Sequence, residues 1–364
     1  MMIKPHPYDC IIYLLQGGGA LGAYQVGVCE NLINNHYPPD WLIGTSIGGI
    51  NAAIIAGNEP DKRVEKLKAF WNKIATPSFG NPLLFQDKWH RWQNLLSSES
   101  ALLFGQQGFF KLRMANPFLQ EMSSPDNLSF YDTSELKATL EEFVDFDLIN
   151  QAKVRLTLSS VCVEDGILVH FDNTEQKLGP EHIMAASALP PGFPAIKIGE
   201  RHYWDGGISS NTPLKIIFEE KVPKKLLCFM VDLFSRTADQ PRTMMDVLKR
   251  KKDLEFVSQY QEILKYFFEM HKLRHIIRTI SEEHADKDCY DQVSLGHPCA
   301  LNIIRFQYVD SDADLWTKDF EFSQHSIKQR QEKGREDVKK LLEEPLTLRI
   351  IPDDSGFRLH DIRH

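Results

Sequence analysis

Residues 41–57 read Trp41-Leu42-Ile43-Gly44-Thr45-Ser46-Ile47-Gly48-Gly49-Ile50-Asn51-Ala52-Ala53-Ile54-Ile55-Ala56-Gly57. A short apolar run is followed by a G-x-S-x-G pentapeptide and then by a segment of small and aliphatic residues. The order of strand, sharp turn and helix raises a serine hydroxyl above the edge of a sheet, where it can act as a nucleophile. Gly44 and Gly48 suit this turn, because it is strained and leaves no room for a Cβ beside the hydroxyl. The pattern therefore predicts that Ser46 is a nucleophile.

A glycine-rich turn, Gln16-Gly17-Gly18-Gly19-Ala20-Leu21-Gly22, follows the first apolar run and opens the next expected helix. A G-x-G-x-x-G turn in this place also occurs in dinucleotide-binding proteins, but those carry an acidic residue at the end of the second strand. Here that position is occupied by Gly44-Thr45-Ser46. We therefore interpret the turn as an oxyanion hole, whose backbone N–H groups face a developing negative charge. Its candidate residues are Gly17, Gly18, Gly19 and Gly22.

A third motif, Trp204-Asp205-Gly206-Gly207, lies in the second half of the chain. Asp205 ends a short expected strand, and Gly206 and Gly207 permit a tight turn that can point its carboxylate at Ser46. In isolation the same residues would be read as an ordinary turn. A carboxylate that deprotonates a serine directly needs a dry, shaped pocket. The histidine alternatives, His182 and His202, have no sequence context typical of a catalytic base.

The residues after this motif, Asn211-Thr212-Pro213-Leu214, predict the start of a helix, with Asn211 or Thr212 as the N-cap and Pro213 in the first turn.

Three motifs in this order resemble the patatin-like phospholipases, which have a glycine-rich loop, a G-x-S-x-G elbow and a later D-G-[GA] motif. The stretch Ala186–Pro194 also resembles the approach to the family's aspartate, and the resemblance covers residues 9–235. It implies a three-layer α/β/α fold with a mostly parallel central sheet. It also implies a Ser-Asp dyad without histidine, in which Ser46 is the nucleophile and Asp205 the base. The implied activity is hydrolysis of fatty acyl esters, usually of phospholipids or lysophospholipids.

The chain departs from the family at Leu21, where the oxyanion loop often has Arg or Lys. Loss of this cation removes an electrostatic contact with a phosphate near the loop but leaves the backbone donors in place. Three other functions share part of this pattern. An acyltransferase would use the same acyl-enzyme, and a lipid-binding scaffold would have a vestigial site, which the intact motifs disfavour. A Ser-Asp-His α/β-hydrolase is disfavoured because only one strand precedes the strand that leads into Ser46, and the oxyanion glycines follow that first strand.

Strand-length apolar runs alternate with helical segments through the first 235 residues, which predicts a largely parallel sheet covered by helices on both faces. We expect a catalytic domain at residues 1–235 and, at 236–364, a mainly helical extension with one or two strands. Expected strands cover 10–15, 41–44, 154–163, 167–171, 203–204, 226–232, 301–309 and 346–351. Expected helices cover 21–35, 47–57, 62–74, 181–188, 243–280 and 321–342.

Residues 76–131 are expected to form an irregular cap rich in aromatic residues. The cap is either a satellite cluster or a lid that lines an acyl-chain pocket. Its aromatic residues are Phe79, Phe85, Trp89, Trp92, Phe104, Phe109, Phe110, Phe118 and Phe130. In the extension, the basic run Lys249-Arg250-Lys251-Lys252 is either a solvated helix face or a contact for anionic lipid headgroups.

The composition limits the remaining possibilities. The net charge of −8 argues against a nucleic-acid partner. Six scattered cysteines predict reduced thiols in a cytoplasmic protein. His284, Cys289, His297 and Cys299 match no zinc spacing, and we expect neither metal nor cofactor. No apolar run reaches the roughly 20 residues of a membrane span, so membrane contact would be peripheral.

Overall fold

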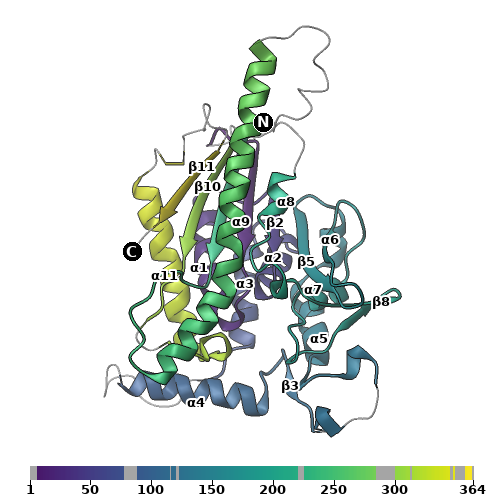
Figure 1. Ribbon diagram of the computed structural model, residues 1–364. Helices are drawn as coiled ribbons and strands as arrows, with labels where there is room; N and C mark the ends of the chain where they lie inside the picture. The colour runs from purple at the N-terminus through teal and green to yellow at the C-terminus, as the bar shows by residue number, and fades with distance from the viewer. Residues whose placement is uncertain are drawn as a thin grey trace.

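The computed structural model describes residues 6–77, 88–114, 116–119, 123–219, 225–283, 300–311, 314–344, 347–348 and 357–362. Within these residues a nine-stranded sheet forms the centre of the molecule, in the order β11-β10-β9-β1-β2-β5-β8-β7, with β6 paired to β5 (Figure 1). The six strands from β11 to β5 are parallel to one another, and β6, β7 and β8 are antiparallel to their neighbours. The strands are β1 (Cys10–Leu15), β2 (Trp41–Gly44), β5 (Arg155–Cys162), β6 (Leu168–Asp172), β7 (Ile196–Ile198), β8 (Arg201–Asp205), β9 (Lys225–Asp232), β10 (Ala300–Gln307) and β11 (Phe357–Ile362).

Helices cover both faces of this sheet. Their bounds are α1 (Ala23–Asn34), α2 (Ile47–Ala56), α3 (Arg63–Lys73), α4 (Lys88–Phe104), α5 (Ser134–Phe143), α6 (Phe146–Asn150), α7 (Pro180–Ala186), α8 (Lys215–Phe218), α9 (Met244–Glu283) and α11 (Gln324–Glu343). Short 3₁₀ turns are η1 (Gly19–Gly22), η2 (Pro117–Leu119), η3 (Pro125–Asn127), η4 (Gly206–Ile208) and η5 (Lys318–Phe320), and a two-stranded ribbon joins β3 (Lys111–Leu112) to β4 (Tyr131–Asp132).

Alternation along β1 explains the layers, because successive side chains of a strand point to opposite faces. Tyr13 and Leu15 belong to the apolar core shared with α1, α2 and α3. Ile12 and Leu14 belong to a second core, shared with α8. Helix α9 crosses the front of the sheet in Figure 1 and contacts α8 and β11. The predicted α/β class with a mostly parallel sheet between helical layers is therefore confirmed.

The C-terminal residues belong to the same sheet. Strand β10 pairs with β9 along its whole length, and β11 adds the outermost strand. Helix α11 packs along α1, and Gly27 and Gly334 make this contact close: a Cβ on either glycine would collide with a backbone carbonyl of the other helix. The sheet thus continues across the predicted boundary at residue 235.

The expected elements that fall on described residues agree with the observed ones to within three residues at either end. Helices α4, α5 and α6 and strands β7 and β11 were not predicted; α4 lies in the stretch expected to be irregular. The expected strand 346–351 lies largely outside the described residues, as do Phe79, Phe85, His284, Cys289, His297, Cys299 and the side chains of Trp89 and Trp92. No described helix is both long and apolar enough to cross a bilayer.

Candidate active site

Ser46 stands in the turn between β2 and α2 with a backbone φ of 54°. This left-handed conformation is strained for a residue with a side chain, so neighbouring contacts must hold it. The Ser46 N–H donates to the Ala186 carbonyl at 2.8 Å, and the Ser187 hydroxyl donates to the Ser46 carbonyl at 3.2 Å. The end of α7 therefore fixes the turn that presents the serine.

The glycines of the pentapeptide allow β1, β2 and α2 to meet closely. A Cβ on Gly44 would lie 2.5 Å from the Gly48 carbonyl oxygen, and one on Gly48 would collide with the Leu15 carbonyl at the end of β1. Side chains at either position would separate the helix from the strands, which is why the G-x-S-x-G spacing is required here.

Asp205 ends β8 and is completely buried. Its N–H donates to the Ala188 carbonyl at 3.0 Å, so the short segment 186–188 positions both Ser46 and Asp205. The Gly207 N–H donates to Asp205 Oδ1 at 2.7 Å. The other oxygen, Oδ2, is buried and has no hydrogen bond of regular geometry within the described part of the chain.

Burial raises the pKa of Asp205 from 3.8 to about 7, although contacts with the Ser46 hydroxyl and the Gly207 N–H act in the opposite direction. The environment disfavours the charged carboxylate, and a carboxyl group in such a site is a stronger base than an ordinary aspartate. The buried carboxyl group of Asp205 and the half-buried side chain of Ser46 thus line one cavity.

The glycine turn lies beside this pair. Gly17, Gly18 and Gly19 line the same cavity as Ser46 and Asp205. No described residue accepts a hydrogen bond from the N–H of Gly18 or Gly19, so both donors are available to a ligand. Gly22 does not line the cavity. It packs against Ile47, and a Cβ on Gly22 would lie 2.6 Å from the Ile47 side chain.

Side chains after Asp205 hold this turn in place. The Asn211 amide donates to the Gly17 carbonyl at 3.1 Å, and the Gln16 amide donates to Thr212 Oγ1 at 2.9 Å. Helix α8 begins only at Lys215, after an N-cap residue, Leu214, that makes no side-chain cap. The prediction that Asn211 or Thr212 caps a helix is therefore wrong: the Asn211 side chain binds the glycine turn, and the Thr212 side chain binds Gln16 instead.

The two candidate histidines lie elsewhere. His202 lies on β8, and its Nδ1 is 2.8 Å from Glu164 Oε1. The buried His182 packs edge-on against Phe171. No histidine is found among the described residues that line the cavity.

The cavity is narrow, with a volume of about 70 Å³, and Ser46, Asp205 and the glycine turn form its polar end. Its remaining walls are mainly aromatic. They come from the cap, the loop before β7, the residues after β9, and the C-terminal part of the chain: Phe109, Phe110, Leu189, Phe193, Phe234, Phe256, Phe320 and Phe322.

The C-terminal part supplies functional residues that no motif revealed. Phe256 of α9, Asp319 and Phe320 of η5, and Phe322 all border the cavity. The Asp319 carbonyl also lies where a Cβ on Gly19 would stand, so η5 packs directly on the glycine turn. No sequence pattern pointed to any of these four residues.

A buried cation from the same region supports the glycine turn next to Leu21. Leu21 itself is fully buried. Arg330 of α11 donates through Nη1 to the Ala20 carbonyl at 3.2 Å and through Nη2 to Asp314 Oδ1 at 3.0 Å. Arg330 does not line the cavity, so its charge lies behind the turn rather than facing a ligand.

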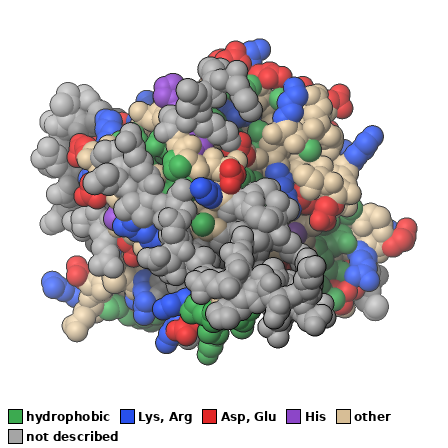
Figure 2. Space-filling view, turned by 90° about the horizontal axis from the view of Figure 1, so that it is seen from above, with side chains coloured by type: hydrophobic (Ala, Val, Ile, Leu, Met, Phe, Trp, Pro, Cys, Tyr) green, Lys and Arg blue, Asp and Glu red, His purple; other side chains and the backbone are tan. Residues whose placement is uncertain are grey.

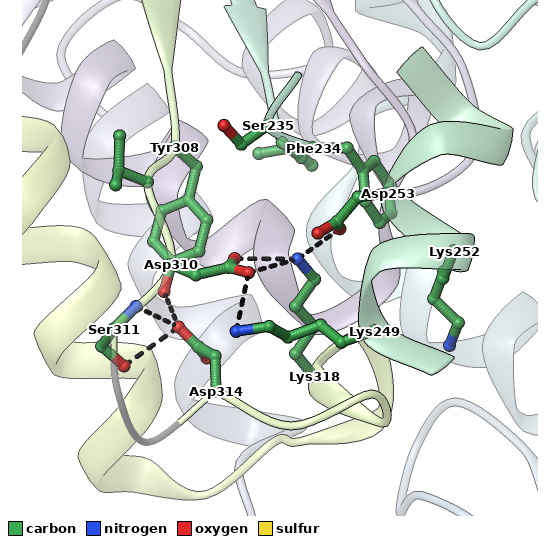
Figure 3. A network of polar contacts seen from close by, with 12 residues as sticks. Phe234, Ser235, Lys249, Lys252, Asp253, Tyr308, Asp310, Ser311, Asp314 and Lys318 are labelled. Carbon is green, nitrogen blue, oxygen red and sulfur yellow. Dashed lines mark hydrogen bonds and ion pairs between the residues drawn. The ribbon is translucent and has the colours of Figure 1, made fainter. Parts of the chain in front are cut away.

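Figure 3 shows the polar network that joins α9, the end of β10 and η5. The buried Lys318 ammonium donates to Asp253 at 2.6 Å and to Asp310 at 2.8 Å, and Lys249 lies 3.4 Å from Asp310. Burial of a charge is tolerated only when it is paired in this way. Lys318 therefore anchors η5, and with it Asp319 and Phe320, over the glycine turn.

This network also uses part of the basic run. Lys249 pairs with Asp310, and Lys252 pairs with Asp319 at 2.7 Å. Arg250 donates to the Ser235 carbonyl at 3.1 Å, and Lys251 lies 2.6 Å from Glu255. All four cations have partners within the chain, which weakens the interpretation that they bind lipid headgroups.

Comparisons with known proteins identify two regions. A family model described as patatin-like phospholipase matches residues 13–218, and one described as patatin phospholipase matches residues 254–354. No curated protein matches the chain. Among solved structures the chain is similar to VipD from Legionella pneumophila, at 12% identity and a TM-score of 0.39, over 98% of this chain and 76% of that chain. Since the first model matches more than half of its length, the chain belongs to the patatin-like phospholipase family, a family of lipid acyl hydrolases.

Proposed function

We propose that this protein hydrolyses fatty acyl esters of phospholipids or lysophospholipids through a dyad of Ser46 and Asp205. The observation that carries the proposal is the cavity itself: a serine, a buried aspartate of raised pKa and a glycine turn share one end of it, and aromatic side chains form the rest. A polar reacting end and apolar walls suit an ester bond attached to an acyl chain.

In the first step, the Ser46 Oγ attacks the ester carbonyl while Asp205 Oδ2 takes the hydroxyl proton. The carbonyl oxygen becomes an oxyanion, which the N–H groups of Gly18 and Gly19 stabilise in this proposal. The tetrahedral intermediate collapses, the proton passes from Asp205 to the leaving alcohol, and an acyl-Ser46 ester remains. Water then attacks this ester while Asp205 accepts one of its protons. When the second tetrahedral intermediate collapses, Asp205 returns the proton to Ser46 Oγ and the fatty acid leaves.

The aromatic residues are proposed to hold the acyl chain. A cavity of about 70 Å³ is small beside the roughly 300–1,000 Å³ of pockets that enclose drug-sized ligands. A long chain therefore requires the walls to move apart. Phe109 and Phe110 belong to the cap, so we propose that the cap acts as the lid of an acyl-chain pocket.

Mass spectrometry of lipid products tests the proposal with purified wild-type protein, Ser46→Ala and Asp205→Ala. Each substitution is expected to lower fatty acid release by at least about 10³-fold, because the residues of a catalytic dyad act as one unit. Ser46→Ala should also abolish labelling by a fluorophosphonate probe. A folded variant that retains activity would refute the dyad.

The same experiment, run with added lysophospholipid or alcohol acceptors, separates hydrolysis from acyl transfer. A transferase would convert the acceptor to a new ester at the expense of free fatty acid.

A further inference from the structure

The cap exposes large apolar side chains. Between residues 103 and 119, five of them expose more than half of their surface, namely Leu103 (60%), Phe104 (76%), Met114 (102%), Phe118 (82%) and Leu119 (82%). We call these five residues the cap surface. Isolated apolar residues are common on protein surfaces, but a group of this kind marks a site of interaction.

The cap surface is held together as one unit. In the β3–β4 ribbon Leu112 is paired with Tyr131, whose hydroxyl donates to the Leu102 carbonyl near the end of α4 at 2.8 Å. The Phe118 ring packs on Phe130 at 5.9 Å between centroids. Helix α4 and strand β3 are in contact, at the lower edge of the molecule in Figure 1.

The cap surface is continuous with the wall of the cavity. Phe109 and Phe110, from the middle of the same segment, line the cavity beside Ser46, and Phe110 packs edge-on against Tyr131 at 4.9 Å. One face of this segment thus closes the cavity, and the other carries exposed apolar side chains.

The charge of the segment is also distinctive. Residues 103–119 contain Lys111 and Arg113 but no Asp or Glu, in a chain of net charge −8. Lys111 lies 3.7 Å from Asp132 across the ribbon, whereas no carboxylate of the described residues forms an ion pair with Arg113. The opposite end of the molecule, seen in Figure 2, shows charges of both signs interspersed. Apolar side chains together with Lys or Arg are the combination that binds at the surface of an anionic membrane.

We propose that the cap surface docks on a phospholipid bilayer that contains anionic lipid, and so brings the cavity to its substrate. This inference rests on the proposed function, because the bilayer is the source of the acyl ester. Docking would place the apolar side chains of Met114, Phe118 and Leu119 among the lipid chains while Phe109 and Phe110 remain against the cavity. The membrane therefore meets the protein on the wall that must open.

Helix α9 provides a matched control. Its C-terminal half also exposes apolar residues, including Leu273 (54%) and Ile277 (38%). This part of α9 projects at the upper end of Figure 1, far from α4 and β3, and it does not border the cavity. Substitutions there change surface hydrophobicity without touching the cap.

The test measures co-sedimentation with vesicles of phosphatidylcholine and phosphatidylglycerol at 4:1, using Met114→Ser/Phe118→Ser and Leu273→Ser/Ile277→Ser. The Ser46→Ala background is used for binding, so that products do not alter the vesicles. The cap variant is expected to lose roughly thirty-fold in vesicle affinity, and the α9 variant to bind like the parent. Phe104→Ser alone, remote in sequence from the first pair, should lower affinity about five-fold.

Hydrolysis of a monomeric short-chain ester by the same variants in the active background should change less than two-fold, while hydrolysis of vesicle lipid falls with affinity. Unchanged vesicle binding by both cap variants would overturn the proposal, as would an equal loss in the α9 variant. The proposal would also be overturned if the cap variants were monomers, the parent a dimer, and vesicle binding the same in both, since the cap surface would then join two copies of the chain. An inactive wild type that still binds vesicles through the cap surface would refute the proposed function and leave the docking intact.

Discussion

Replacement of Asp205 by asparagine is expected to make the protein both inactive and more stable. The amide has nearly the shape of the carboxyl group, but it cannot accept the Ser46 proton or carry a charge. In the wild type the carboxyl group is completely buried and its pKa is raised to about 7 by that burial. The folded state therefore disfavours the ionised form that the proposed mechanism needs.

The size and sign of the effect follow from the pKa. The folded-state value of about 7 lies about three units above the ordinary value of 3.8, and one unit corresponds to about 1.36 kcal/mol. Because the folded state holds the proton more tightly than the unfolded chain, the wild type loses stability as the pH rises from about 4 to 7. Asp205→Asn does not titrate. Its advantage should be under about 1 kcal/mol at pH 4 and about 4 kcal/mol at pH 8.

Urea denaturation at pH 4 and pH 8 measures this difference directly. Thermal denaturation gives a second measure: at about 2.1 cal/mol/K per residue, the unfolding entropy of 364 residues is about 0.76 kcal/mol/K, so 4 kcal/mol raises the Tm by about 5 °C. An Asp205→Asn protein no more stable than the wild type at pH 8, or an advantage that does not change with pH, would refute the reasoning.

Asp314 is the matched control of opposite sign. Burial acts to raise the pKa of Asp314, but the Arg330 charge and hydrogen bonds outweigh it and lower the pKa to about 2. The ionised form therefore stabilises the fold above pH 3.8, and this contribution is lost as the pH falls through 2. Asp314→Asn should destabilise the protein at pH 7 by at least about 2 kcal/mol.

Three further outcomes are expected. Because Asp205 must be ionised to accept a proton, kcat/KM for a monomeric neutral ester should rise with pH to a plateau above an apparent pKa of about 7, and a flat profile from pH 5 to 8 would contradict its role as base. Gly19→Ala forces a side chain into a left-handed conformation (φ 55°) and against the Asp319 carbonyl, so it should lower kcat by roughly 100-fold. The control is Gly166→Ala, which is also left-handed but has open space around it and should leave kcat unchanged. Arg330→Gln removes the buried charge that binds the Ala20 carbonyl and Asp314, so it should lower the free energy of unfolding, measured with urea, by roughly 3–5 kcal/mol. The control Arg335→Gln breaks partly exposed ion pairs with Glu30 and Glu332 and should lower it by under about 1 kcal/mol.

The motif-bearing part of the fold could be predicted because its requirements are local. The turn at Ser46 needs small residues at Gly44 and Gly48 for contacts within a few residues or with the adjacent strand β1. Continuous apolar runs reveal buried strands such as Cys10–Leu15, since both of their faces are covered. Such signals are complete within a short window of sequence.

The walls of the cavity could not be predicted, because their positions depend on the order of strands in the sheet. Phe256, Phe320 and Phe322 lie more than 200 residues after Ser46 and have no motif around them. They reach the cavity because β10 pairs in parallel with β9. The chain between these two strands therefore has to cross the face of the sheet, and α9 makes this crossing. The roles of Asn211 and Thr212 were missed for a similar reason, since their partners lie on the turn after β1.

The position of Arg330 shows how the chain can lack a cation in its oxyanion loop. A cation in the loop could face the substrate as well as support the backbone. Arg330 serves only the second purpose, because it binds the Ala20 carbonyl from behind and is enclosed by Asp314 and the carbonyls of Lys318 and Glu321. In the proposed mechanism, stabilisation of the oxyanion is thus left to backbone N–H groups of the glycine turn, on which residues of α11 and η5 pack. All three motifs end before residue 208, yet the site that they mark is completed by residues beyond 250.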